Sequence, residues 1–208
     1  MKPFGVLLAG GLSRRMGGGD KGLMPLGGKP VMQHAFDRLR EQTDGIVINA
    51  NGDPSRFAGF EATVIPDTIA GFAGPLAGVL AGMRYAAEQD TPPNWIVTGA
   101  ADTPFFPTNL IERLQAAAAS QNSIVLAGSN GRRHPVFGLW PINLADHLEN
   151  WLQDENNRKV LAWVNQHNWA MAEFDQPAFP NSDIDPFFNI NTPEDFTLAQ
   201  DLLMENAS

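Results

Sequence analysis

Residues 7–21 read LLAGGLSRRMGGGDK. A short apolar run ends in paired glycines, and two arginines, three further glycines and a lysine follow it. Glycine lets the backbone approach a ligand closely and turn its N–H groups toward an anion, while arginine and lysine neutralise phosphate charge. The stretch therefore predicts a loop that cradles phosphate groups at the end of a buried strand. A flexible glycine hairpin without a ligand is the alternative interpretation.

Two familiar phosphate-binding motifs do not fit this loop. A Walker loop requires Ser or Thr after its Gly-Lys pair, whereas Lys21 is followed by Gly22. Gly17, Gly19 and Gly22 match G-x-G-x-x-G, but they lie well past the predicted strand, and the glycines and prolines that follow forbid a helix there. We interpret that match as accidental.

Short apolar, β-branched runs alternate with helical patterns along the first part of the chain. Strands are predicted at 4–9, 45–50, 62–65, 95–99 and 123–127, with helices at 30–43, 75–89 and 108–120. Thr108 is the predicted N-cap of the last of these helices. This alternation predicts an open, mostly parallel α/β sheet with helices on both faces, where ligands bind beyond the carboxyl ends of the strands.

The rhythm changes in the last third of the chain. A strand is predicted at 134–140, helices at 143–151 and 157–166, an extended segment at 169–174, and turns at 177–186. A final helix begins at Thr192 as N-cap, with Pro193 first and two carboxylates in its positively polarised first turn. Without a repeat or a linker, residues 1–208 are expected to form one domain.

Polar residues follow several of the predicted strands. Asp102, directly after the strand at 95–99, is well placed to hold Mg²⁺ beside a nucleotide, although it could instead cap a turn. Asn49 and Asp67 stand at the ends of two other strands, where they could bind a base or a ribose. Asn189 and Asn191 project from one side of an extended segment, and are either metal or acceptor ligands or turn formers.

Composition and charge narrow the class of protein. The net charge of −9 argues against general nucleic-acid binding. Residues 1–140 carry 12 Lys/Arg against 11 Asp/Glu, and residues 141–208 carry 2 against 12, so the N-terminal part is expected to receive an anionic substrate. No cysteine is present, which excludes disulfides and thiolate chemistry and is compatible with a reducing cytoplasm. No apolar run is long enough for a membrane span or a secretory signal.

Together, these segments resemble the molybdenum cofactor guanylyltransferases of the nucleotidyltransferase superfamily. The resemblance follows the family's order across nearly the whole chain. It rests on Leu8–Gly11, Ser13–Gly18, Asp20–Gly22, Asn49–Asn51, Gly74–Gly78, Asp102–Pro104, His134–Val136 and Asn189–Asp195. The paired glycines 10 and 11 are similar to the branch that uses guanine, whereas relatives that use cytidine have Ala-Ala-Gly there. The resemblance implies a Rossmann-like, three-layer α/β/α domain, with a GTP-binding N-terminal part and an acceptor-binding C-terminal part.

The resemblance also implies roles for individual residues. The guanine and phosphate groups would be bound by Leu8, Ala9, Gly10 and Gly11. Arg14 and Arg15 would hold the triphosphate, Lys21 would contact phosphate, and Asn49 and Asp67 would bind the nucleoside. Asp102 would contact GTP and ligate Mg²⁺, the implied cofactor, so that Arg15, Lys21 and Asp102 are the expected catalytic residues. Asn189 and Asn191 would lie on the acceptor side.

The implied reaction transfers GMP from GTP to molybdopterin or its molybdenum-loaded form and releases pyrophosphate. It would take place in the cytoplasm, without nucleic acid or membrane, on a protein that is a monomer by default. Proteins that deliver or receive the cofactor would be transient partners. The alternatives are a molybdopterin cytidylyltransferase, a sugar-phosphate nucleotidyltransferase, and a nucleotide sensor without catalysis. Retention of Lys21 and Asp102 speaks against the sensor.

Overall fold

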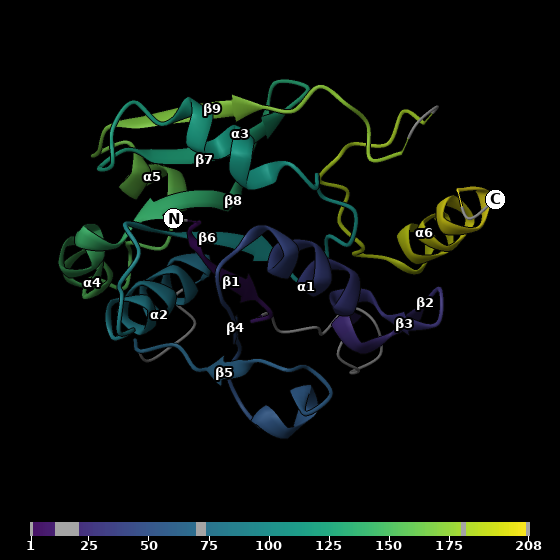
Figure 1. The fold of residues 1–208 in the computed structure, drawn as a ribbon, viewed down its shortest axis with the longest axis horizontal. Helices are drawn as coiled ribbons and strands as arrows, with labels where there is room; N and C mark the ends of the chain where they lie inside the picture. Colours follow the sequence, from purple (N-terminus) through teal and green to yellow (C-terminus); the bar gives the residue numbers. More distant parts are fainter. Residues whose placement is uncertain (1, 11–20, 70–73, 180–181, 207–208) are drawn as a thin grey trace.

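A computed structural model describes residues 2–10, 21–69, 74–179 and 182–206 of the chain. Within this part, seven strands form one sheet in the order β5-β4-β1-β6-β8-β7-β9 (Figure 1). The strands are β1 (Phe4–Leu8), β4 (Ile46–Asn49), β5 (Thr63–Ile65), β6 (Trp95–Ala100), β7 (Ile124–Ser129), β8 (Arg132–Pro141) and β9 (Trp169–Glu173). The strand β8 is antiparallel to both of its neighbours, and the other pairs are parallel. The predicted, mostly parallel sheet is confirmed.

Helices cover both faces of this sheet. One core joins β-strand residues to Phe36 of α1 (Val31–Gln42) and Leu114 of α3 (Leu110–Ala117). The core on the opposite face contains Leu80 of α2 (Pro75–Ala87), Leu148 of α4 (Ala145–Leu152) and Trp163 of α5 (Val160–Val164). Along β1, successive side chains alternate between the two cores, because neighbouring residues of a strand point to opposite faces. The three-layer α/β/α architecture is therefore confirmed.

The C-terminal helix returns to the N-terminal part of the chain. A small hairpin of β2 (Pro25–Leu26) and β3 (Lys29–Pro30) lies beside α6 (Pro193–Glu205), as Figure 1 shows. Their apolar side chains, including Leu26 and Leu202, form a third buried cluster. A capping box starts α6, since Thr192 accepts from the amide of Asp195 and the Asp195 carboxylate accepts from the amide of Thr192. Both features connect residues 189–192 to the rest of the domain.

Most predicted elements are confirmed, but two local details differ. The helix predicted from Thr108 begins at Leu110 with Asn109 as N-cap, so the prediction of Thr108 as N-cap is wrong. The sequence pattern also does not predict the hairpin at residues 25–30, because each of its strands has two residues and lacks the alternating pattern of a strand. No helix among the described residues has the length and apolar character needed to cross a bilayer.

A tight turn connects β7 to β8 and gives β8 its antiparallel direction. Asn130 and Gly131 occupy its two central positions with φ of 49° and 73°. Two consecutive positive φ angles define the type I′ turn that Asn-Gly favours in two-residue hairpins. The turn places Ser129 and the residues after Gly131 next to each other at the end of β7, where several polar contacts of the site are made.

Pairing of β6 with β8 is reinforced by a buried chain of hydrogen bonds. Thr98 Oγ1 donates to the carbonyl of Val136 (2.8 Å) and accepts from Trp140 Nε1 (2.8 Å), and both side chains are fully buried. We expect Thr98→Val to lower the free energy of unfolding by about 1–3 kcal/mol, because a buried donor and a buried acceptor lose their partner while the shape is nearly kept. Urea denaturation measures this change.

Thr63→Val in β5 is the matched control, since Thr63 is exposed and makes a long contact to Tyr85 (3.5 Å). Equal unfolding midpoints for the two variants would show that the Thr98 hydroxyl contributes nothing to stability.

Candidate active site

The carboxyl ends of β4, β1 and β6 lie side by side at one edge of the sheet. Leu8 at the end of β1 pairs with Asn49 of β4 on one side and with Ala100 of β6 on the other. Backbone hydrogen bonds extend this pairing. The amide of Ala9 donates to the backbone carbonyl of Asn49 (2.9 Å), and the amide of Ala101 donates to that of Leu8 (3.1 Å). The register therefore places the start of the glycine loop between the ends of β4 and β6.

Asn49 and Asp67, which the sequence predicts as nucleoside ligands, are in direct contact. Asp67 Oδ1 accepts from Asn49 Nδ2 (3.0 Å), and Asp67 Oδ2 accepts from Asn51 Nδ2 (2.7 Å). Asn51 Oδ1 in turn accepts from the amide of Asp67 (2.9 Å), and Asn49 Nδ2 also donates to the carbonyl of Ile65 (3.2 Å). Two amides thus fix the orientation of the carboxylate, and its remaining lone pairs can accept hydrogen bonds from hydroxyl or N–H groups of a ligand.

The amide oxygen of Asn49 packs against the backbone of α2. A methyl group at Gly78 would lie 2.3 Å from Asn49 Oδ1 and 2.6 Å from Leu8 Cδ2, well inside van der Waals contact. At Gly10 it would lie 4.0 Å from the same oxygen. Asn49 is therefore enclosed between the start of the glycine loop and the second turn of α2, and it is 4% exposed. Its position depends on a helix residue without a side chain.

Asp102 lies two residues beyond the end of β6 and is half-buried. Its carboxylate Oδ1 accepts from Thr103 Oγ1 (3.4 Å), and its carbonyl accepts from the amide of Ile190 (2.9 Å). The Thr103 hydroxyl also contacts Asn189 Oδ1. The structure thus brings Asn189 next to Asp102 across 87 positions of sequence, as the pattern alone could not establish.

Asn191 lies at the same edge but faces a different partner. Its side chain is exposed, and its backbone amide donates to Asp195 Oδ2 (2.8 Å) at the start of α6. Asn189 is also exposed, so both predicted acceptor ligands are accessible to a ligand in solution.

The residues at this edge suit a magnesium ion. Asp102 supplies a carboxylate, and Asn189 supplies an amide oxygen beside it, and oxygen ligands are those that Mg²⁺ prefers. Among the described residues, no group of three His, Cys, Asp or Glu could hold a metal. In proteins, Mg²⁺ is usually bound through one or two carboxylates, with substrate phosphates and water completing the coordination.

The amino end of α2 reaches the same edge, because α2 follows the short strand β5. Its N-cap, Gly74, has a φ of 71°, and no side chain caps the helix. Pro75 occupies the first turn. Free N–H groups at the start of a helix and the positive end of its dipole attract anions. The amino end of α2 is therefore suited to bind a phosphate group beside the ends of β1 and β4.

Four predicted phosphate contacts fall outside this description. Gly11, Arg14 and Arg15, and the side chain of Lys21, lie outside the part of the chain that the structure describes. The backbone of Lys21 begins the 3₁₀ helix η1 (Lys21–Leu23), which packs on α1. Their assignments remain predictions.

A second group of polar residues lies where β7 ends. Ser129 Oγ is 2.6 Å from His134 Nε2 and 2.7 Å from Asp185 Oδ2. Burial lowers the pKa of His134 and Arg132 lowers it further, while Asp185 opposes this only partly. Burial would raise the pKa of Asp185, but hydrogen bonds from Ser129 and the Phe187 amide hold it below its ordinary value. At neutral pH the carboxylate is therefore ionised and the imidazole is neutral.

The sequence analysis did not predict Ser129 or Asp185, and it named His134 only within the segment His134–Val136 of the family resemblance. The Asn-Gly pair at 130–131 was the available signal, since a hairpin there brings Ser129 beside the following strand. Nothing in the sequence pattern connects Asp185 to it.

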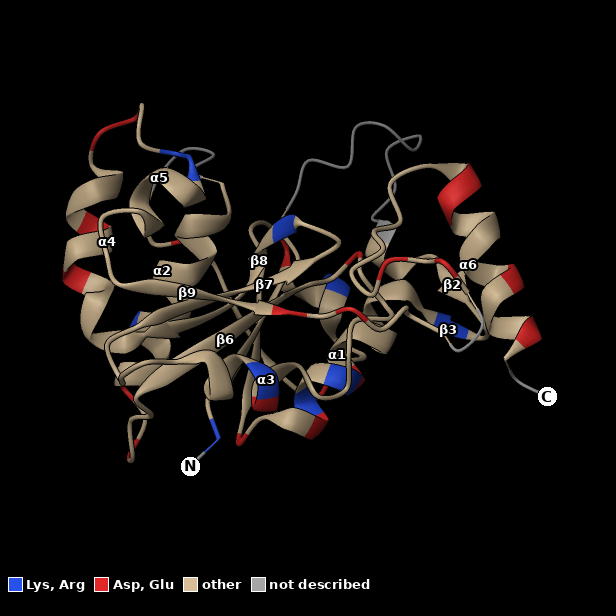
Figure 2. Ribbon diagram, turned by 90° about the horizontal axis from the view of Figure 1, so that it is seen from above, with Lys and Arg blue, Asp and Glu red and all other residues tan. Residues whose placement is uncertain are grey.

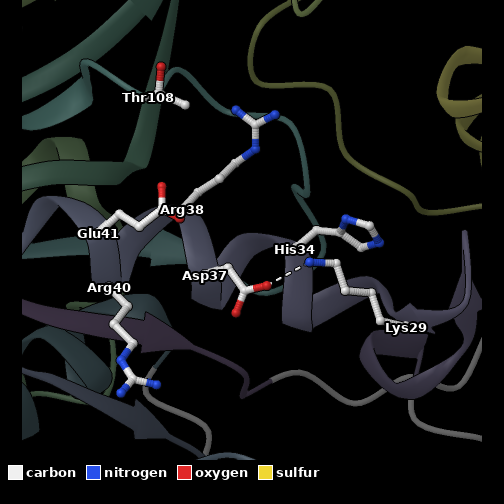
Figure 3. A pocket seen from close by; sticks show the side chains of 7 residues that line it. All are labelled: Lys29, His34, Asp37, Arg38, Arg40, Glu41 and Thr108. Carbon is white, nitrogen blue, oxygen red and sulfur yellow. Dashed lines mark hydrogen bonds and ion pairs between the residues drawn. The ribbon is translucent and has the colours of Figure 1, made fainter. Parts of the chain in front are cut away.

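A groove of about 700 Å³ lies on the outer side of α1 (Figure 3), lined by Lys29, His34, Asp37, Arg38, Arg40, Glu41 and Thr108. Its basic groups already have partners. Lys29 pairs with Asp37 (2.7 Å) and Arg40 pairs with Glu61 (3.5 Å). Arg38 donates to the carbonyl of Phe106 (2.9 Å). None of the residues that line the groove belongs to the cluster at the strand ends, so it is a charged surface groove apart from the candidate site.

Known proteins resemble this chain in sequence and in fold. A family model described as a MobA-like NTP transferase domain matches residues 5–181. A molybdenum cofactor guanylyltransferase from Mesorhizobium japonicum is 47% identical over 205 residues, which cover 98% of this chain and 97% of the relative. Another molybdenum cofactor guanylyltransferase, from Rhizobium meliloti, is 46% identical over an alignment that covers 95% of this chain and 90% of the relative. The crystal structure of molybdopterin-guanine dinucleotide biosynthesis protein A from Archaeoglobus fulgidus shares the fold, with a TM-score of 0.74, 23% identity and coverage of 97% and 99%.

The contact between Gly78 and Asn49 leads to a test of the site. We expect Gly78→Ala to weaken GTP binding by up to about tenfold, because the new methyl group must displace Asn49 Oδ1 or push α2 outward, and one hydrogen bond is worth up to about 1.5 kcal/mol. Calorimetric titration with GTP measures the affinity. A wild-type dissociation constant in this variant would show that nucleotide binding does not depend on the close contact between Asn49 and Gly78.

Gly59→Ala is the control for the substitution itself, since a methyl group at this exposed position meets no atom within 4 Å. It should bind GTP as the unaltered protein does.

Proposed function

Because the chain belongs to the molybdenum cofactor guanylyltransferase family of MobA-like NTP transferases, we propose that it transfers GMP from GTP to molybdopterin. One observation supports this most directly. The nucleoside pair Asn49–Asp67 and the group formed by Asp102, Thr103 and Asn189 lie at the same sheet edge, on either side of the start of the glycine loop. This arrangement puts the proposed nucleoside ligands on one side of the loop and the proposed metal and acceptor ligands on the other.

On the nucleoside side, the protein's task is to bind and orient. Asp67 offers an ionisable carboxylate fixed by two amides, which suits a ligand hydroxyl or N–H group. Leu8, Ala9 and Gly10 offer an apolar side chain and a backbone that a base or phosphate can approach. The amino end of α2, Lys21, Arg14 and Arg15 would hold the phosphates.

The proposed chemical step needs no covalent intermediate on the protein. An oxygen of the acceptor's terminal phosphate attacks the α-phosphorus of GTP, a new P–O bond forms, and the bond to the leaving pyrophosphate breaks. Phosphate oxygens are already ionised near neutral pH, so the attack requires no strong general base. Catalysis then comes from positioning the two substrates in line and from neutralising their charge.

Asp102, with Asn189 beside it, would hold Mg²⁺. When bound, the ion supplies charge neutralisation for the triphosphate. The residues around it have the complementary task of fixing these ligands. Thr103 does so through its hydroxyl, whose single hydrogen is shared between two acceptors, the Asp102 carboxylate and Asn189 Oδ1.

The proposal extends to the setting of the reaction. GTP and a pterin phosphate are intracellular metabolites, so we place the reaction in the cytoplasm, with molybdopterin or its molybdenum-loaded form as acceptor. The protein would act as a monomer, with transient contacts to proteins that deliver and receive the cofactor, and without nucleic acid or membrane.

Pyrophosphate release is the direct measurement. With molybdopterin and Mg²⁺ supplied, we expect release from GTP and much slower release from CTP. Faster release from CTP would overturn the assignment of guanine to the paired glycines while keeping the reaction. Release from GTP when a sugar phosphate, but not the pterin, is supplied as acceptor would change the assigned acceptor. Binding of GTP without release under any acceptor would indicate a sensor.

Two substitutions test the catalytic assignments. We expect Asp102→Ala and Lys21→Ala each to lower kcat by about 10²–10³-fold, as the loss of one preorganised charge-stabilising group does in other enzymes. The matched controls are Asp90→Ala and Lys159→Ala, which change the same charges at exposed positions. The controls should retain wild-type rates, and near-normal turnover in either of the first pair would contradict its assignment.

A further inference from the structure

Ser129, His134 and Asp185 form a chain of hydrogen bonds with one consistent direction. The Asp185 carboxylate is ionised and only accepts, so the single hydroxyl hydrogen of Ser129 is directed to Asp185 Oδ2 (2.7 Å). His134 Nε2, which lies 2.6 Å from the same hydroxyl, must then carry its hydrogen and donate to Ser129. The chain runs from His134 through Ser129 to Asp185.

This direction excludes a hydrolytic role, although the three residue types are those of a catalytic triad. A nucleophilic serine needs a histidine nitrogen that accepts its proton, whereas here the hydroxyl donates to the carboxylate and accepts from the histidine. Ser129 is also fully buried, so no substrate can reach its oxygen. The chain therefore serves to hold parts of the structure together.

What it holds is the beginning of the segment that leads to Asn189. Besides Ser129, Asp185 binds the amide of Phe187 through Oδ1 (2.8 Å). The Phe187 ring is buried and stacks on His134, with ring centroids 4.4 Å apart. The same ring contacts those of Phe137 and Phe174, at centroid distances of 4.8 Å and 5.3 Å. One end of the segment is thus fixed to β7 and β8.

The other end of the segment is fixed to β6. The amide of Ile190 donates to the carbonyl of Asp102 (2.9 Å), and Asn189 contacts Thr103. Residues 182–192 form neither helix nor strand, so the segment has no regular hydrogen-bond ladder of its own. Its course past the site therefore depends on the contacts at its two ends, and a loosened first end lets Asn189 move.

We propose that Asp185 and Ser129 are positioning residues for the acceptor, because their hydrogen bond anchors the segment that presents Asn189 beside Asp102. This inference rests on the proposed function, which places Asn189 and Asn191 on the acceptor side. The anchor lies away from Asn49 and Asp67, so it acts on acceptor turnover and leaves nucleotide binding unchanged.

Steady-state kinetics with the full-length protein separate these two effects. We expect Asp185→Ala to lower kcat/KM for molybdopterin by about 10²-fold, as misplacement by about 1 Å can do, with the dissociation constant of GTP unchanged. Ser129→Ala should have an effect of the same kind, and the effect of the double variant should be smaller than the product of the two single effects, because both changes remove one shared contact. Asp183→Ala, an exposed carboxylate two residues away, should behave as wild type.

The conservative variant Asp185→Asn shows whether residue 185 acts through its hydrogen bonds or through its negative charge. Its amide can donate to Ser129, which then donates to His134 in the other tautomer, while its oxygen still accepts from Phe187. The long contact from Asn130 Nδ2 (3.4 Å) is lost. The chain of hydrogen bonds is kept with its direction reversed, so most acceptor activity should return. Activity as low as that of Asp185→Ala would overturn the proposal.

Hydrogen exchange gives a readout that needs no substrate. In Asp185→Ala the amides of Phe187 and Ile190 should exchange faster, while those of Val6 and Val97 in the central sheet stay protected. Unchanged exchange at 187 and 190, or equal acceleration in the sheet, would overturn the anchor. If Asp185→Ala does not fold, Ser129→Ala removes the same hydrogen bond. If the wild-type protein transfers nothing to molybdopterin, the proposed function fails, while the exchange data still decide whether Asp185 anchors the segment.

Discussion

The close approach of α2 to the central strands is the constraint on which the site depends. Gly78 and Gly82 lie one turn apart on the same face of α2. A methyl group at Gly82 would lie 2.5 Å from Val6 of β1, and one at Gly78 would lie 2.3 Å from the amide oxygen of Asn49. Any side chain at these positions would lift the helix off the sheet. The two glycines therefore set how far the uncapped amino end of α2 stands from β1 and β4, where a phosphate would bind.

The architecture could be predicted from local features of the sequence, namely the periodicity of apolar residues and the residues that cap helices. The alternation of Val6 and Leu7 between two cores, and the helical spacing of Met32, Phe36 and Leu39, are consequences of strand and helix periodicity that the sequence displays directly. The capping box at Thr192 was also readable, because cap, proline and carboxylate occur at fixed offsets. The N-cap of α3 is Asn109 and not its neighbour Thr108. Sequence patterns place a helix boundary only to within one or two residues, so they cannot choose between two adjacent residues that both favour the N-cap position.

The candidate site could be predicted only where it follows from topology. Parallel strands bring their carboxyl ends to one edge, so Asn49 and Asp102 could be assigned to a common site from their place after a strand. The contacts of Thr103 with Asn189 and of Ser129 with Asp185 join residues 86 and 56 positions apart within irregular segments. No periodicity or motif specifies such pairs, because they are fixed by how the last segment lies across the finished sheet.

The acidic C-terminal third raises the question of how an anionic acceptor approaches it. Asp and Glu residues, red in Figure 2, lie along α4 and α6, and the sequence of α6 contains four of them and no Lys or Arg. The two carboxylates that flank Asn189 and Asn191 are, however, surrounded by donors. Asp185 accepts from Ser129 and from the amide of Phe187, and Asp195 accepts from the amides of Asn191 and Thr192.

Hydrogen bonds from N–H and O–H groups place positive partial charge around each of these two carboxylates and weaken the repulsion that they exert on a phosphate. The same hydrogen bonds fix the backbone on either side of residues 189–191. A single set of interactions thus gives the segment its shape and reduces the effect of its negative charge, which is how an acidic part of the chain can border a site for a phosphorylated acceptor.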